Sequence, residues 1–363
     1  MLTTLLLSTA LATTPTSIDP TQATAMLDLL HNCNTGAVPQ AQIQQVIDLP
    51  GTQLIIHQQN ISRRITPEQY KEVLTSACKG AIANIAPSQP GPRAAKGVQG
   101  LINDVAPSLL WGRKHIPELQ QRLNTALKTP DLDRVVPLAQ ENLPQKIDLS
   151  PKLYFVMGGR AGAAASDDGI YIDLLQDAWK AKDTSTVMTP HEMVLFFAHE
   201  THHVGYGRIL DQKKNALHLS PGQEQAWSFL TSILMEGSAT LLINAEGSWS
   251  ELETADHIKP DLARLPTLLP KAQEIFRRSL QNNLSKQDFE EAESNFTGEG
   301  YHATGAKLLY VIQKARGKKA VLEVMDHPQS LLKIYNQCAA EINEPFRFDP
   351  ITASALETQL SRP

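Results

Sequence analysis

Residues 189–210, TPHEMVLFFAHETHHVGYGRIL, form the stretch of sequence on which the fold and the chemistry of this chain depend. Thr189 can cap a helix, Pro190 suits the first helical position, and Glu192 lies three residues after the cap, which completes a capping box. The run 193–198 that follows is apolar on every face of a helix. The sequence therefore predicts a buried helix over 189–210.

Within this helix, His199 and His203 are four residues apart with Glu200 between them, which makes an HExxH motif. Residues four apart share a helix face, so both imidazoles can reach one ion while Glu200 projects beside them. Two histidines on an otherwise apolar helix would be costly to bury without partners, which argues against ordinary core or surface histidines. We therefore predict Zn²⁺ at His199 and His203, with Glu200 acting on a water molecule.

A second helix is predicted over 221–245, capped by Ser220 and mostly apolar, with Glu236 in its middle. A carboxylate on a buried face needs a partner. Two histidines and a glutamate from a following helix complete the three protein ligands of a hydrolytic zinc site. We therefore predict Glu236 as the third ligand. The alternatives are a solvent-facing Glu236, or a ligand from the connection at Asp211, His218 or Glu224.

Two short segments before the motif helix are rich in β-branched and aromatic residues, KLYFVM at 152–157 and GIYIDL at 169–174. Both are predicted strands, joined by a flexible hairpin loop over 158–165. An exposed strand edge beside a metal would let an extended peptide pair with the sheet. The other segments predict helices, among them 21–32 and 66–77. The fold class predicted is α+β, mainly α-helical, with a small β-sheet packed beside the HExxH helix.

The chain divides into three parts by the character of its sequence. Residues 1–17 contain a short apolar run that ends in Ala-Leu-Ala and resemble a signal peptide, although no Lys or Arg precedes Arg63. Residues 18–149 form an N-terminal helical region, and residues 150–363 form the region of the HExxH helix, either as two units or as one continuous domain. The leader predicts a secreted or periplasmic protein, and without a leader the protein would be cytoplasmic.

Composition argues against several classes of protein. The net charge of −5, the pI near 6.1 and the lack of a Lys/Arg-rich block predict no nucleic-acid partner. No apolar stretch in the sequence approaches the roughly 18 residues that cross a bilayer, so no transmembrane segment is predicted. Cys33, Cys78 and Cys338 are too few and too scattered for a disulfide framework or a cysteine-type zinc site.

HETHH in the motif helix, MEGSA around Glu236 and GYHATG at 300–305 together resemble the gluzincin clan of metallopeptidases. The likeness is closest to an uncharacterised family of predicted zinc-dependent peptidases, and it extends more weakly from Ile18 to Tyr335. The resemblance implies a zincin-like core that hydrolyses peptide bonds in a peptide or protein substrate. The implied zinc ligands are His199, His203 and Glu236, and the implied catalytic base is Glu200.

Two positions depart from the pattern of that clan. Well-studied members often have an Asp four residues after the third ligand, where this chain has Thr240. A Tyr-Tyr pair of the family appears here as Tyr301-His302, so two residues compete to stabilise the oxyanion. A tyrosine can donate a hydrogen bond while neutral, whereas a histidine donates best when protonated, which a nearby zinc would disfavour. The sequence therefore favours Tyr301, with His302 as the alternative.

The predicted reaction is peptide hydrolysis by a zinc-activated water, with Glu200 as general base. Two alternatives remain open. Glu200-x-x-His203 and Glu299-x-x-His302 are both ExxH pairs, the ligand unit of di-iron carboxylate proteins, which would make the protein an oxidoreductase. The other alternative is a non-catalytic protein in which zinc only holds helices together.

Overall fold

The structure is a computed structural model, and it describes residues 17–36, 38–63, 65–86, 92–128, 131–159, 162–166, 168–181, 188–296 and 298–361. All of the predicted leader except Ser17 lies outside the described residues. The fold is mainly helical with one small mixed sheet, which confirms the predicted class.

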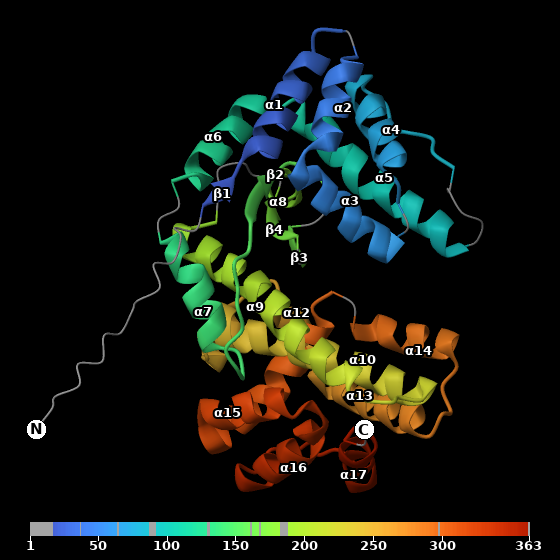
Figure 1. The fold of residues 1–363 in the computed structure, drawn as a ribbon, viewed down its shortest axis with the longest axis vertical. Coiled ribbons are helices and arrows are strands. Elements are labelled where there is room, and N and C mark those ends of the chain that lie inside the picture. The colour runs from blue at the N-terminus through green and yellow to red at the C-terminus, as the bar shows by residue number, and fades with distance from the viewer. Residues whose placement is uncertain are drawn as a thin grey trace, which may run out of the picture.

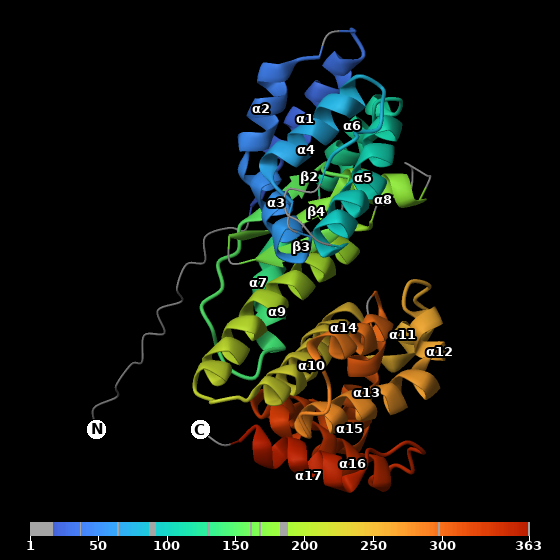
Figure 2. The same cartoon turned by 90° about the vertical axis from the view of Figure 1, so that its right-hand side faces the viewer.

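Helices surround the sheet in the upper part of the molecule, and a second group of helices forms the lower part (Figures 1 and 2). One long helix, α9 (Pro190–Asn215), begins beneath the sheet and runs down into the lower group. The upper helices are α1 (Thr21–Cys33), α2 (Gln40–Asp48), α3 (Pro50–Arg63), α4 (Pro67–Cys78), α5 (Pro92–Gly112), α6 (Ile116–Ala126) and α8 (Leu174–Ala181).

The regular structure of the lower part is helical among its described residues, and turns and loops connect the helices. It contains α7 (Val135–Glu141), α10 (Pro221–Ser238), the π-helical continuation of α10 named η2 (Ala239–Asn244), α11 (Trp249–Thr254), α12 (Lys259–Ala263), α13 (Leu265–Leu280), α14 (Lys286–Glu293), α15 (Gly300–Asp326), α16 (Leu331–Glu341) and α17 (Pro350–Gln359). Capping boxes begin the three helices for which the sequence predicts them, at Thr66, Thr189 and Ser220. At Gly317, where the sequence indicates a helix end, the backbone leaves helical geometry with φ 81°, and α15 then continues to Asp326.

The sheet contains β1 (Ile18–Asp19), β2 (Leu153–Val156), β3 (Ala163–Ser166) and β4 (Gly169–Asp173) in the order β1-β2-β4-β3. β2 runs parallel to β1 and to β4, and β3 runs antiparallel to β4 at the edge. The two predicted strands exist, but the hairpin predicted between them is wrong. Parallel neighbours such as β2 and β4 cannot be joined by a tight turn. After β2 the chain therefore passes to the edge of the sheet, runs back as β3, and then turns into β4, which lies between β2 and β3. β3 escaped prediction because its three alanines carry little strand propensity.

The N-terminal helices fix the segment that leads from β2 to β3. Tyr70 of α4 donates to the carbonyl of Gly158 at 2.9 Å, and Ser108 of α5 donates to that of Gly159 at 3.1 Å. The side-chain oxygen of Gln22 in α1 accepts from the Met157 amide at 2.7 Å. All three side chains are buried. The N-terminal helices, whose role the sequence leaves unassigned, therefore set the course of the chain into the edge strand.

Two hydrophobic cores lie on either side of α9. The sheet shares one core with the N-terminal helices, and that core includes Phe155, Ile172 and Phe197. The other core lies among the lower helices and includes Tyr206 from the second half of α9. α9 thus belongs to both cores, and the sheet packs with residues on the N-terminal side of position 150.

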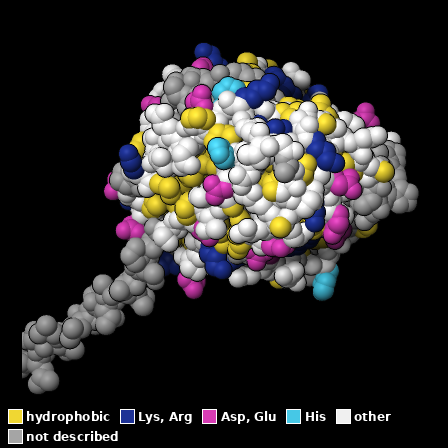
Figure 3. Space-filling model, turned by 90° about the horizontal axis from the view of Figure 1, so that it is seen from above, with side chains coloured by type: hydrophobic (Ala, Val, Ile, Leu, Met, Phe, Trp, Pro, Cys, Tyr) yellow, Lys and Arg dark blue, Asp and Glu magenta, His cyan; other side chains and the backbone are white. Residues whose placement is uncertain are grey.

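One helix of the described residues, Pro221–Asn244, is long and apolar enough by length and composition to cross a membrane. The sequence shows no uninterrupted apolar stretch there because polar residues such as Glu236 break it. In the fold, 72% of its most apolar window is buried. A core helix passes the same test, so the expected lack of a transmembrane segment stays a prediction. On the face seen from above, acidic and basic side chains intermingle (Figure 3).

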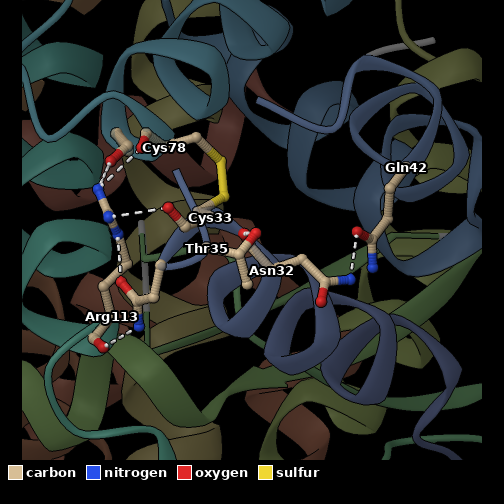
Figure 4. The surroundings of a disulfide bond; sticks show 8 residues. Asn32, Cys33, Thr35, Gln42, Cys78 and Arg113 are labelled. Carbon is tan, nitrogen blue, oxygen red and sulfur yellow. Dashed lines mark hydrogen bonds between the residues drawn. A yellow bond between two sulfur atoms is a disulfide. The ribbon is translucent and has the colours of Figure 1, made fainter. Parts of the chain in front are cut away.

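Cys33 at the end of α1 and Cys78 at the end of α4 form a disulfide (Figure 4). Arg113 lies beside it and donates to the carbonyls of Ala77 at 2.6 Å, Cys78 at 3.0 Å and Cys33 at 3.1 Å. The last carbonyls of a helix lack partners within it and carry partial negative charge, so one guanidinium neutralises two helix ends. The sequence did not predict this single bridge because only helix packing brings together cysteines 45 residues apart.

Replacing Cys33 by Ser should lower the free energy of unfolding by about 2 to 4 kcal/mol, because the bridge closes a loop of 45 residues in the unfolded chain. Urea denaturation with and without a reducing agent measures the effect. Reduction should lower the midpoint of the parent protein and of Cys338→Ala, since Cys338 is a free buried cysteine. It should leave the midpoint of Cys33→Ser unchanged, and a parent protein insensitive to reduction would contradict the bridge.

Candidate metal centre

His199 and His203 lie one turn apart on α9, as the HExxH spacing predicts, and their ring centroids are 4.4 Å apart. The side chain of His199 is 8% exposed and that of His203 is 15% exposed. This pair faces the second long helix of the lower part, α10.

Glu236 of α10 points at both histidines. Its Oε2 atom lies 3.1 Å from Nε2 of His203 and 3.8 Å from Nε2 of His199. The Glu236 side chain remains 30% exposed, so the group can be reached from solvent. The solvent-facing alternative for Glu236 therefore does not describe this side chain, which turns toward the HExxH pair.

A third helix adds His302, at the start of α15. Nε2 of His302 lies 3.0 Å from the same Oε2 atom of Glu236. The ligand atoms of His199, Glu236 and His302 all lie within 4.8 Å of one another, and no other group of three such residues in the described chain is as close. His203, a ligand that the sequence predicts, is not part of this close group, although its Nε2 atom lies 3.1 Å from Glu236. Three helices therefore bring three imidazoles around one carboxylate, at a site referred to below as the metal centre.

Two glycines allow α10 and α15 to approach this closely. A Cβ atom on Gly305 would lie 1.9 Å from the carbonyl oxygen of Ile233, and one on Gly237 would lie 2.2 Å from the carbonyl carbon of Gly305. Gly237 follows Glu236 directly, and Gly305 lies three residues after His302. The backbones thus meet where they carry the two side chains, as glycines in GYHATG predict.

Electrostatics at the metal centre favour a charged Glu236. Burial alone would raise its pKa, but the charge of His203 and hydrogen bonds from three imidazoles hold it well below the usual value. Burial lowers the pKa of His199. For His302 the effect of burial is outweighed by the hydrogen bond and charge of Glu236, which bring its pKa to about 9. A cation is therefore the natural partner for this carboxylate.

Glu200 lies beside the metal centre on α9 and is half-buried. Burial raises the pKa of Glu200 to about 7, and the charge of Glu236 acts in the same direction. The imidazoles of His199 and His302 oppose this shift. Groups with pKa values near 7 are suited to accept and return a proton at neutral pH.

The donor set fits zinc. Imidazole nitrogens and carboxylate oxygens are the ligands of hydrolytic zinc sites, which use three protein groups. The other ring nitrogens, Nδ1 of His199 and of His203, are buried and have no hydrogen-bond partner among the described residues. The hydroxyl oxygen of Thr240 is also buried without such a partner. The position where the clan often has an Asp therefore supplies no carboxylate to orient these two histidines.

His302 does face a carboxylate with its other nitrogen. Oε2 of Glu299 lies 3.4 Å from Nδ1 of His302, which is an ion-pair distance, but Nδ1 makes no hydrogen bond among the described residues. The imidazole thus stands between Glu299 and Glu236. The sequence places this pair at a spacing of three but gives Glu299 no role in a peptidase. The carboxylate of Glu299 lies on the side of the His302 ring away from Glu236. In a di-iron centre the glutamates lie on the same side as the irons, so this placement does not match such a centre.

Tyr301 does not reach the metal centre with its hydroxyl. That hydroxyl donates to Oε1 of Glu293 at 2.6 Å, and burial raises the pKa of Tyr301. Its ring packs against Phe229 and Phe296. The three alternative third ligands do not belong to the close group either, among the residues that the structure describes: Asp211, His218 and Glu224.

Residues 43–344 match the sequence family DUF5700, described as "Putative zinc dependent peptidase". The chain belongs to this family. The match contains every side chain of the metal centre, so the predicted relation to a family of zinc-dependent peptidases is confirmed at that level. No curated protein and no solved structure matches the chain significantly.

Replacing Gly237 or Gly305 by Ala should destabilise the fold by about 1 to 3 kcal/mol or more, because the added Cβ overlaps backbone atoms of the facing helix. The variants should also bind zinc more weakly, since the helices must move apart. Urea denaturation and zinc titration measure the two effects.

Gly207→Ala is the matched control. Gly207 lies in α9, and a Cβ atom there would meet nothing within 4 Å. Its replacement should be neutral or stabilise by up to about 1 kcal/mol, because alanine favours a helix over glycine. Equal losses in Gly207→Ala and Gly237→Ala would show that the close helix contact is not the cause of the loss.

Proposed function

We propose that this protein is a zinc-dependent peptidase of the gluzincin type. The observation that carries the proposal is the convergence of His199, His203 and His302 on one carboxylate oxygen of Glu236. Membership in a family described as zinc-dependent peptidases supports it. A purely structural role for zinc would give no part to Glu200, which lies beside the donors and whose pKa is about 7, whereas a peptidase needs such a group.

His199, His203 and Glu236 would hold the zinc ion, as the HExxH spacing on α9 and the direction of Glu236 on α10 indicate. When bound, zinc would supply a Lewis acid and lower the pKa of water to about 7. Three protein ligands leave a position open for the substrate. His302, which faces the same carboxylate, is then free to act on that substrate.

Glu200 would serve as the proton carrier of the reaction. Its half-buried carboxylate would accept a proton from the attacking water and give it to the amine that leaves. Its pKa of about 7 suits both transfers.

His302 is the better candidate for stabilising the oxyanion. Its Nε2 atom faces the metal centre, whereas the hydroxyl of Tyr301 is bonded to Glu293. Glu299 stands 3.4 Å from Nδ1 and would keep the proton on that side of a neutral ring or stabilise the protonated ring. This proposal reverses the preference for Tyr301 that the sequence suggests.

The edge strand β3 offers a place for an extended peptide. Among the described residues it pairs on one side only, with β4, and α9 packs against both strands. A peptide that adds to an exposed sheet edge gains main-chain hydrogen bonds without regard to its side chains. β3 would therefore hold the substrate backbone alongside the helix that carries His199.

We further propose that the protein works outside the cytosol, in the extracellular space or the periplasm. The disulfide between Cys33 and Cys78 supports this, because such bonds persist in oxidising compartments. The apolar leader of the sequence agrees with it.

Glu236→Ala should lower the affinity for zinc by more than about 100-fold, because loss of a ligand exceeds the loss seen for groups that only orient ligands. Metal analysis after dialysis against a chelator measures it. His199→Ala and His203→Ala should behave alike. Stoichiometric zinc in Glu236→Ala, with loss in Asp211→Ala, His218→Ala or Glu224→Ala, would identify another third ligand.

Glu200→Gln tests the function itself. The variant should keep its fold and one zinc per chain, and its hydrolysis of a peptide mixture should fall by about 100- to 10,000-fold, because the amide cannot carry the proton. Mass spectrometry of the products measures turnover. Full turnover by Glu200→Gln would refute the proposed mechanism, and two irons per chain in the parent protein would favour the oxidoreductase.

His302→Ala should lower turnover by about 100- to 1000-fold with zinc retained, whereas Tyr301→Phe should keep near-normal turnover. The structural reason is that the hydroxyl of Tyr301 donates its hydrogen bond to Glu293. Zinc content and turnover are measured on the same preparations. If His302→Ala loses zinc as Glu236→Ala does, His302 is a fourth ligand, and if only Tyr301→Phe loses turnover, the roles are exchanged.

A further inference from the structure

A cavity of about 550 Å³ lies along α9, toward the N-terminal end from the metal centre. Its apolar lining comes from Leu195 and Phe196 of α9, Ala245 after η2, and Leu252 of α11. A volume between about 300 and 1000 Å³ is typical of sites that bind small ligands or side chains.

The cavity adjoins the metal centre through α9. Leu195 and Phe196 precede His199 by four and three residues, so they lie on the same face of the helix, one turn away. The ring of Phe196 stacks at 6.4 Å from the ring of His199. A substrate held at His199 would therefore place a neighbouring side chain in this cavity.

Carboxylates stand at the rim of the cavity. Glu192, Glu251 and Asp256 line it and are exposed to solvent. None of the described residues that line it is a lysine or an arginine, and His257 is the one residue among them that can carry a positive charge. The cavity thus combines apolar walls with a negatively charged mouth.

We propose that this cavity binds a lysine or arginine side chain of the substrate, next to the bond that is cut. A lysine or arginine lays its aliphatic stem along apolar surface and keeps its charged end in water, which matches the walls and the rim. The position of the cut bond beside the cavity rests on the proposed function. The binding of a lysine or arginine side chain in the cavity does not.

The first measurement is binding without turnover. Blocked seven-residue peptides of alanine and glycine carry one central lysine, norleucine or glutamate, and calorimetry on zinc-loaded Glu200→Gln gives their Kd values. The lysine peptide should bind about 10-fold more tightly than the norleucine peptide, and the preference should shrink at high salt because its charges are exposed. Equal binding of lysine and norleucine would overturn the proposal.

The second measurement removes the charge at the rim. Glu251→Gln with Asp256→Asn, introduced into Glu200→Gln, should reduce the preference for lysine by about 3- to 10-fold and leave binding of the norleucine peptide unchanged. Asp28→Asn with Asp48→Asn, which removes two exposed carboxylates of α1 and α2 with no part in the cavity, is the control for net charge. A preference that survives in the rim double variant, or falls equally in the control double variant, would refute the assignment of the rim.

The third measurement separates this proposal from the proposed function. The parent protein should cut the lysine peptide faster than the norleucine peptide, at a bond next to lysine. Cleavage of both at equal rates leaves the peptidase intact and overturns the cavity's role. Selective binding that depends on Glu251 and Asp256, with no cleavage of any peptide, supports the cavity and refutes the peptidase.

Discussion

The contact between Gly237 and Gly305 is the constraint on which the metal centre depends. Because neither residue has a Cβ, the backbones of α10 and α15 meet at distances that any side chain would forbid. That contact carries Glu236 and His302 with it, so their 3.0 Å approach is a consequence of backbone packing. A half-buried carboxylate brought this close to three imidazoles is stabilised when the cluster carries positive charge, from protons or from a metal.

Local patterns in the sequence predict the parts of the fold that depend on neighbours in the chain. The capping boxes at Thr189 and Ser220, and the pairing of His199 with His203, follow from spacings of three and four, and all are present. The course of β3 and the bridge of Cys33 to Cys78 depend on contacts between distant segments, which one sequence does not contain. An alanine-rich strand is recognisable only after its partner β4 is known.

The same limit applies to the candidate site. The direction of Glu236 could be inferred from its apolar helix, because a buried carboxylate must find a partner. The choice between Tyr301 and His302 could not be inferred. Adjacent side chains on a helix point in directions about 100° apart, so a shift of one residue in the helix start exchanges their roles. Packing decides it, since Phe229 and Phe296 enclose the tyrosine ring and Glu293 takes its hydroxyl.

The histidine rings of the site are held in different ways on α9 and on α15. On α9, the outer nitrogens of His199 and His203 have no carboxylate or carbonyl partner among the described residues, so the helix backbone and the packed walls must hold these rings. On α15, Nδ1 of His302 also makes no hydrogen bond among the described residues, but the ring lies between two carboxylates, so its position depends on charge. The glycine contact links the two sides: it sets the distance across which Glu236 faces imidazoles from both helices. A metal bound by His199, His203 and Glu236 would fix α9 to α10, and the glycine contact would extend that constraint to α15.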